Sequence, residues 1–199
     1  TYDADCVSGD FTNPYEAKGE ITFAGVKTLE GKKLEADMFS FEVYEEGSYI
    51  YIAEAYNDAT GKINYPKIEY TQADVGEHTY VVRETSTDGN GITVDTNTYT
   101  VTVTVEDNGD GTLKVTASDN ATALDFTNTY EAKGEVIFSG VKTLEGRDLT
   151  AGEFSFQLID AAGKVIETVK NDADGKFAFT ELKYTLADVG EHAYTVKEV

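Results

Sequence analysis

Three side chains with reactive or polar groups lie at strand positions where apolar residues are expected. In residues 15–31, YEAKGEITFAGVKTLEG, the alternation of a β-strand places Lys27 on the face that carries the large apolar side chains. The same alternation places Glu84 on the apolar face of residues 78–84 and Asn128 on that of residues 124–130. Because burying an unpaired ammonium group costs several kcal/mol or more, we expect Lys27 to have a partner in the core.

A buried amine, carboxyl group and carboxamide can form a covalent bond. Burial lowers the pKa of a lysine and raises that of a glutamate, so Lys27 can act as a neutral nucleophile beside a protonated Glu84. A protonated Glu84 can hydrogen-bond the carboxamide oxygen of Asn128, make its carbon more electrophilic and then pass protons to the leaving ammonia. The trio therefore predicts an isopeptide bond between Lys27 and Asn128, formed once per molecule at a high effective concentration.

The elements that must position these residues occur twice. Residues 15–31 return as YEAKGEVIFSGVKTLEG at 130–146, and TQADVGEHTYVVRET at 71–85 returns as TLADVGEHAYTVKEV at 185–199. The period of about 115 residues suits a compact domain better than a turn of a solenoid.

The repeat predicts three parts of the chain. Residues 1–14 are the last strand of a preceding repeat, 15–129 are a complete repeat, and 130–199 are a truncated second copy. Within the complete repeat, many short alternating segments are separated by turns rich in Gly, Asn and Asp, and no segment sustains a helical period. The fold class predicted is all-β, with β-sandwich domains in tandem.

Composition narrows the function classes. The 199 residues include 37 acidic and 16 basic side chains, for a net charge of −21, which disfavours binding to nucleic acid or to an anionic membrane. No apolar run approaches the length of a membrane span. The one cysteine, Cys6, cannot form an intrachain disulfide, so it is either a spare small residue or a link to a second chain.

Three motifs in order, GVKTLEG, DVGEHTYVVRE and FTNTY, resemble the isopeptide-linkage module of Gram-positive pilins and surface adhesins. The resemblance covers residues 15–129 and returns in 130–199. It implies Ig-like or CnaB-like β-sandwich domains strung end to end. It also implies that Lys27 and Asn128 are the linked pair and that Glu84 is the catalytic acid.

The resemblance extends to the partial copies. Lys142 and Glu198 match the linking lysine and the catalytic acid, and Asn13 matches the linking asparagine of a preceding module. Neither partial copy can form its own bond within this chain. One hypothesis is that Asn13 of one copy pairs with Lys142 and Glu198 of another copy, head to tail.

The leading functional hypothesis is a structural stalk or pilus shaft on the surface of a Gram-positive cell wall, with neighbouring repeats as partners and a host ligand bound by parts outside this sequence. The alternative is a module that binds a host glycan or matrix protein, for which Tyr49, Tyr51 and Tyr56 are the best candidates. Tandem, nearly identical modules are an unusual setting for an enzyme pocket, so catalytic turnover and a cofactor are not expected.

Two short motifs have ordinary explanations. Residues 65–67, Tyr-Pro-Lys, resemble the pilin motif whose lysine is used by sortase, which would make Lys67 a polymerisation site, but an edge-strand proline explains them as well. Residues 107–111, DNGDG, faintly resemble a calcium loop but suit a hairpin turn, and no metal site is expected.

Overall fold

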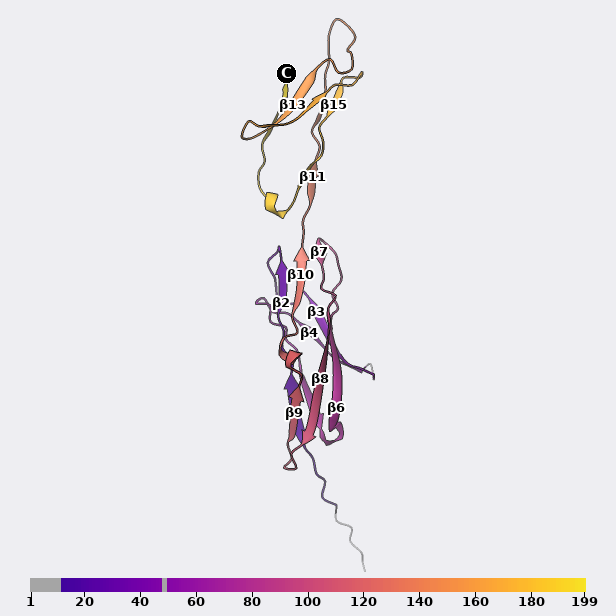
Figure 1. The fold of residues 1–199 in the computed structure, drawn as a ribbon, viewed down its shortest axis with the longest axis vertical. Coiled ribbons are helices and arrows are strands. Elements are labelled where there is room, and N and C mark those ends of the chain that lie inside the picture. Colours follow the sequence, from indigo (N-terminus) through magenta and orange to yellow (C-terminus); the bar gives the residue numbers. More distant parts are fainter. Residues whose placement is uncertain (1–11, 48–49) are drawn as a thin grey trace, which may run out of the picture. The chain divides into compact units, whose positions relative to one another are not determined.

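The computed structural model describes residues 12–47 and 50–199, and it divides the chain into two compact units after Tyr130. Each unit is described by itself (Figure 1). The described part of unit 1 consists of β1 (Lys18–Thr22), β2 (Lys27–Glu30), β3 (Ser40–Glu45), β4 (Ile50–Tyr56), β5 (Lys67–Thr71), β6 (Gly76–Glu84), β7 (Ile92–Thr93), β8 (Thr98–Asp107), β9 (Leu113–Ala117) and β10 (Phe126–Tyr130).

The strands of unit 1 form two layers. One layer is a five-stranded sheet in the order β4-β3-β6-β8-β9, and the other holds the pair β1-β5 and the three-stranded sheet β2-β10-β7. A single cluster of buried residues draws on both layers, including Phe41, Val82 and Val103 from the first and Ile68 and Phe126 from the second. The fold is the Ig-like β-sandwich that the sequence predicts.

The alternation predicted for residues 21–29 is confirmed. Phe23, Lys27 and Leu29 are buried, whereas the intervening side chains at 24, 26 and 28 are exposed. The strand is interrupted at residues 23–26, between β1 and β2, but the inward and outward sides continue through the interruption.

Strands β2 and β10, which are far apart in the sequence, lie side by side in unit 1 (Figure 1). β10 pairs with β2 in parallel, with Phe126 opposite Lys27 and Asn128 opposite Leu29. All other strand pairs in the described part of unit 1 are antiparallel. A Cβ atom on Gly25 would lie 2.0 Å from the carbonyl oxygen of Leu124, so only glycine permits this approach of the two segments.

Unit 2 contains strands equivalent to β1, β3, β4, β5 and β6 of unit 1, whereas residues 142–145, the equivalent of β2, are not in a strand. Its strands are β11 (Gly134–Val136), β12 (Ser139–Val141), β13 (Ser155–Asp160), β14 (Val165–Lys170), β15 (Lys176–Ala178), β16 (Leu182–Tyr184) and β17 (Tyr194–Glu198). No equivalents of β7 to β10 occur within residues 131–199. The buried core of unit 2 is correspondingly small and consists of Phe156, Leu158 and Phe179.

Helical structure in the described residues is limited to three 3₁₀ turns, in agreement with the predicted all-β class. They are η1 (Gln72–Asp74), η2 (Asp119–Thr122) and η3 (Leu186–Asp188). In η1 and η3, a threonine before the turn exchanges hydrogen bonds with the aspartate that ends it, which is a capping box. These turns connect strands and do not contribute to the sandwich layers.

Candidate functional site

The structure brings Lys27, Glu84 and Asn128 together in the core of unit 1. Lys27 begins β2, and Asn128 lies on the neighbouring strand β10, two residues beyond Phe126, which pairs with Lys27. Both side chains therefore project from the same layer. Glu84 ends β6 in the facing sheet, where it lies opposite Phe41 of β3. The carboxylate therefore reaches the other two side chains from across the sandwich.

Glu84 bridges the amine and the carboxamide. Its Oε2 atom accepts a hydrogen bond from Lys27 Nζ at 2.7 Å, and its Oε1 atom accepts one from Asn128 Nδ2, also at 2.7 Å. The side chains of Lys27 and Glu84 are 0% exposed, and Asn128 is 0% exposed as a residue. This is the partner that the burial of Lys27 requires.

The orientation of the Asn128 carboxamide differs from the prediction. We expected Glu84 to bond the carboxamide oxygen, but that oxygen accepts the backbone N–H of Asp95 at 2.7 Å, and the nitrogen faces Glu84. A peptide N–H can only donate, so the atom opposite Asp95 must be oxygen. Glu84 is thus placed against the group that would leave as ammonia.

Aromatic rings surround the trio. Lys27 Nζ lies 4.8 Å from the centre of the Phe39 ring and 6.0 Å from that of Phe41. The Phe126 ring packs 5.1 Å from Phe41 and 5.2 Å from Tyr99, centre to centre. These rings keep water from the site and leave Glu84 as the main counter-charge of Lys27.

Desolvation by this setting lowers the pKa of Lys27 below the usual 10.5, and the hydrogen bond and charge of Glu84 oppose part of that change. A lowered pKa increases the fraction of neutral amine, which is the nucleophilic form.

Unit 2 holds two of the three side chains of an equivalent site. Lys142 Nζ lies 2.9 Å from Glu198 Oε2 and 4.5 Å from the centre of the Phe154 ring. The two side chains are 22% and 42% exposed, in contrast to their buried equivalents in unit 1. Within residues 131–199 no strand equivalent to β10 covers them, so the lysine and the glutamate meet without an asparagine.

The other predicted positions are not part of the site. Asn13 is exposed and lies outside any strand, and Cys6 and Tyr49 lie outside the described residues. The Lys67 side chain is 48% exposed and pairs with Glu20 at 2.8 Å. Pro66 directly precedes β5, whose only strand partner in the described chain is β1, as the edge-strand explanation requires.

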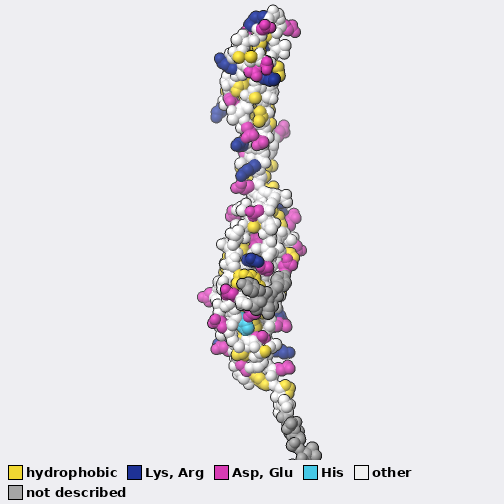
Figure 2. Space-filling view, turned by 90° about the vertical axis from the view of Figure 1, so that its right-hand side faces the viewer, with side chains coloured by type: hydrophobic (Ala, Val, Ile, Leu, Met, Phe, Trp, Pro, Cys, Tyr) yellow, Lys and Arg dark blue, Asp and Glu magenta, His cyan; other side chains and the backbone are white. Residues whose placement is uncertain are grey.

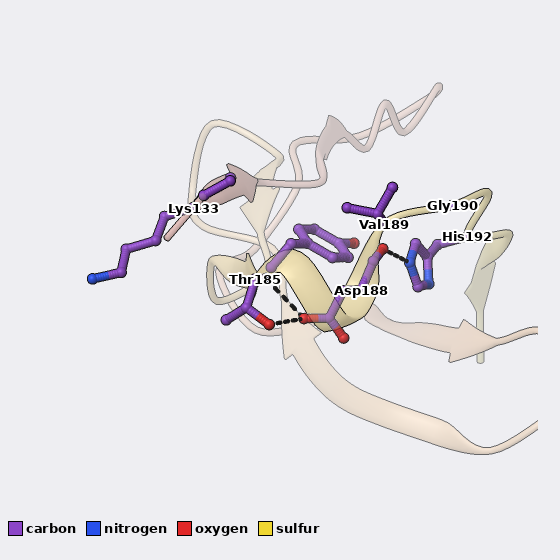
Figure 3. Close-up of a pocket in the computed structure, with 9 residues that line it drawn as sticks. Lys133, Thr185, Asp188, Val189, Gly190 and His192 are labelled. Atoms are coloured by element: carbon purple, nitrogen blue, oxygen red, sulfur yellow. Dashed lines mark hydrogen bonds between the residues drawn. The ribbon is translucent and has the colours of Figure 1, made fainter. Parts of the chain in front are cut away.

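A surface pocket of unit 2 is lined by residues of 132–134 and 184–192 (Figure 3). In unit 1, a Cβ on Gly19 would lie 2.7 Å from Val115 of β9, whereas a Cβ on the equivalent Gly134 would have its nearest neighbour 4.0 Å away. Polar groups lining the pocket bond to one another, as Asp188 does to Thr185 (Figure 3). We therefore interpret the pocket as the place that is equivalent to the one β9 occupies in unit 1.

Acidic side chains are spread over the visible face of unit 1 rather than gathered at one point (Figure 2). Among the described residues, no group of three or more His, Cys, Asp or Glu side chains is arranged to hold a metal ion. No helix in the described chain is long and apolar enough to span a membrane.

Sequence reasoning missed Asp95. It lies in the connection between β7 and β8, where no strand alternation applies. Its contact with Asn128 is made by a backbone N–H, which every residue except proline carries, so no side-chain pattern could have revealed it.

The core of this β-sandwich module thus holds a lysine and an asparagine on neighbouring parallel strands, bridged by a glutamate. A family model described as the Spy0128-like isopeptide containing domain matches residues 23–131 and 138–199. The chain belongs to this family of Gram-positive pilin domains. The family is structural rather than enzymatic, in agreement with the prediction.

Solved structures of pilins are similar to this chain. The T-13 major pilin of Streptococcus pyogenes is 16% identical, with 94% of this chain and 83% of that chain covered and a TM-score of 0.36. A variant of the shaft pilin SpaA of Lactobacillus rhamnosus GG is 14% identical, with 90% and 87% covered and a TM-score of 0.32.

The TIE protein of Bacillus anthracis is 20% identical, with 92% of this chain covered and a TM-score of 0.35, but this chain spans only 28% of its length. No curated protein matches the chain.

Lys27 should titrate below an ordinary lysine when it is not cross-linked. In an Asn128→Ala variant, NMR of ¹³C-labelled lysine ε-carbons should show one lysine with a pKa below 10.5, because desolvation disfavours its charged form. Between that lowered pKa and 10.5 the unfolded chain binds more protons, so stability should rise with pH across this window. An added Lys27→Met change should remove both the low-pKa lysine resonance and the rise of stability with pH. A Lys27 whose pKa is 10.5 or higher would contradict the expectation.

Proposed function

We propose that unit 1 is a structural shaft or stalk module of a cell-wall-anchored pilus or adhesin on a Gram-positive bacterium, and that it is reinforced by a self-formed bond between Lys27 and Asn128. The observation that carries the proposal is the Glu84 carboxylate, which lies 2.7 Å from both the amine and the carboxamide nitrogen in a fully buried site. Membership of a pilin isopeptide family supports it.

The proposed reaction begins with proton transfer from the Lys27 ammonium to Glu84. This transfer replaces a buried ion pair by a neutral amine and a neutral acid, and desolvation favours it. The amine then attacks the Asn128 side-chain carbon, so that negative charge develops on Oδ1.

Glu84 completes the reaction as a proton shuttle. It donates its proton through Oε1 to Nδ2, takes a proton from the attacking nitrogen, and the carbon–nitrogen bond to Nδ2 breaks as the carbonyl re-forms. The products are one amide, one ammonia and a protonated Glu84. Each site reacts once, and the charge that made Lys27 costly to bury is removed.

The position of the bond supports a mechanical role. Tension that enters unit 1 through its N-terminal strands and leaves through β10 would pass directly from Lys27 to Asn128. The bond would also close a loop of about 100 residues, for which chain-entropy models give about 4.7 kcal/mol of stabilisation. Unlike a disulfide, it needs no oxidant, which suits a chain with one cysteine.

The repeat supports a finer organisation. We propose that residues 1–14 end a preceding module, 15–129 form one cross-linked module and 130–199 begin the next. Neighbouring modules of the same kind are then the immediate partners, with a host ligand bound elsewhere in the parent protein.

Intact mass tests the cross-link. The denatured protein should be lighter than its sequence by one ammonia, whereas Lys27→Ala and Glu84→Ala variants should retain the full mass, because each lacks a required group. Lys142→Ala and Glu198→Ala are the matched controls from unit 2 and should still lose one ammonia. A wild-type chain of full mass would refute the proposal.

Stretching single molecules by their ends tests the mechanical role. The cross-linked chain should unfold without releasing the segment between Lys27 and Asn128, because the covalent bond bypasses it. An Asn128→Ala variant should release that segment, which adds roughly 330–360 Å of extension for about 100 residues. Equal extension in both proteins would contradict a bond at this site.

The partly exposed Lys142–Glu198 pair leads to a test of the head-to-tail hypothesis. We propose that a strand of the Asp-Phe-Thr-Asn type completes this half-site, and that Asn13 of a second copy can supply it. Concentrated protein should then give a ladder on a denaturing gel that Asn13→Ala and Lys142→Ala both abolish. A lone monomer band from the wild-type chain would exclude covalent joining of copies.

A further inference from the structure

The connection between β6 and β8 reaches back over the cross-linking site. It carries β7, which pairs antiparallel with the end of β10 through Thr93 opposite Thr129. Two residues further on, the backbone N–H of Asp95 donates to Oδ1 of Asn128 at 2.7 Å. This N–H lies on the opposite side of the carboxamide from Glu84, which faces Nδ2.

Oδ1 is the atom that becomes negatively charged when the Lys27 amine adds to the Asn128 carbon. A donor at 2.7–3.1 Å from such an atom stabilises the transition state without reorganising, and loss of one donor typically costs about 10²- to 10³-fold in rate. The site is buried, so no solvent competes for this bond. The N–H of Asp95 already donates at 2.7 Å to the unreacted oxygen, so it is in place at the atom on which the charge develops.

The side chain of Asp95 holds this N–H in place. Its Oδ2 atom accepts the backbone N–H of Thr127 at 2.7 Å, and its Oδ1 atom accepts that of Asn97 at 2.9 Å. Residue 95 is therefore bonded to β10 at Thr127 through its carboxylate and at Asn128 through its own N–H. Asp88 fixes the preceding residue by accepting the N–H of Val94 at 2.8 Å.

The same contact decides which way Asn128 points. Because the Asp95 N–H demands an acceptor, it turns Oδ1 toward the connection and leaves Nδ2 on Glu84. The leaving nitrogen is thereby placed against the carboxyl group that must protonate it.

We propose that the peptide N–H of Asp95 is the oxyanion donor of the cross-linking reaction and that the Asp95 carboxylate is the positioning group that clamps this donor to β10. The inference rests on the proposed isopeptide bond between Lys27 and Asn128. It assigns to the β6–β8 connection a part in the chemistry in addition to its part in the fold.

An amide-to-ester exchange isolates the donor. Cell-free translation can insert the α-hydroxy analogue of aspartate at position 95, which replaces the N–H by an oxygen and keeps the carboxylate. Intact masses of the full chain, measured at intervals after the chain leaves the ribosome, should show that ammonia is lost about 100-fold more slowly than from wild type. Because the exchange leaves Glu84 and Lys27 intact, the slowing should be equal across the pH range, so the rate profile should keep its shape.

The matched control is the same exchange at position 97. It removes the N–H that bonds the Asp95 carboxylate but leaves the one that bonds Asn128, so the rate should stay within a few-fold of wild type. Ammonia loss at the wild-type rate in the position-95 ester would overturn the inference while leaving the cross-link itself established. A wild-type chain without ammonia loss would instead refute the proposed bond.

Side-chain variants test the clamp independently. Asp95→Asn keeps the N–H and an acceptor oxygen, so it should react within a few-fold of wild type, whereas Asp95→Ala should slow the reaction by roughly 10-fold. An Asp95→Ala variant that reacts as fast as wild type would overturn the positioning role. The Thr127 amide, which bonds the Asp95 carboxylate, should lose protection from hydrogen exchange in Asp95→Ala, whereas the other amides of β10 should be equally protected in the two variants if the loss is one of positioning and not of folding.

Discussion

The structure of unit 1 depends on how one buried ammonium group is neutralised. Lys27 lies at a buried, core-facing position, with aromatic rings around it and the Glu84 carboxylate as its counter-charge. A buried ion pair gains little over an apolar pair of similar volume, because desolvation offsets most of the attraction. An arrangement of this kind is therefore weak as a stabilising device, but it is well suited to a reaction that removes both charges.

The surrounding fold supplies the geometry that such a reaction needs. The parallel pairing of β2 with β10 places Asn128 two residues beyond the partner of Lys27 on the neighbouring strand. Just before these strands, Gly25 permits its segment to approach the backbone of Leu124 closely. The facing sheet supplies Glu84 from the end of β6. Strands from the two layers thus meet at one point, and the packing of the two layers brings the three side chains together.

The two units show which parts of the site depend on one another. In unit 2, Lys142 and Glu198 still meet at 2.9 Å although no equivalent of β10 is present in residues 131–199. Their partial exposure contrasts with the full burial of Lys27 and Glu84. The lysine–glutamate contact therefore does not depend on equivalents of β7 to β10, whereas the full burial of the two side chains is found only in unit 1, where those strands are present.

The sequence by itself determined the all-β class, the repeat and the inward positions of Lys27, Glu84 and Asn128, because a strand's alternation is local and a charge on an apolar face stands out. Only the tertiary structure decided that β2 and β10 pair in parallel and that Glu84 reaches both partners from the facing sheet, since these contacts join residues far apart in the chain. It also reversed the expected orientation of the Asn128 carboxamide. That orientation depends on a backbone N–H from Asp95, and a backbone group has no signature in the residue types.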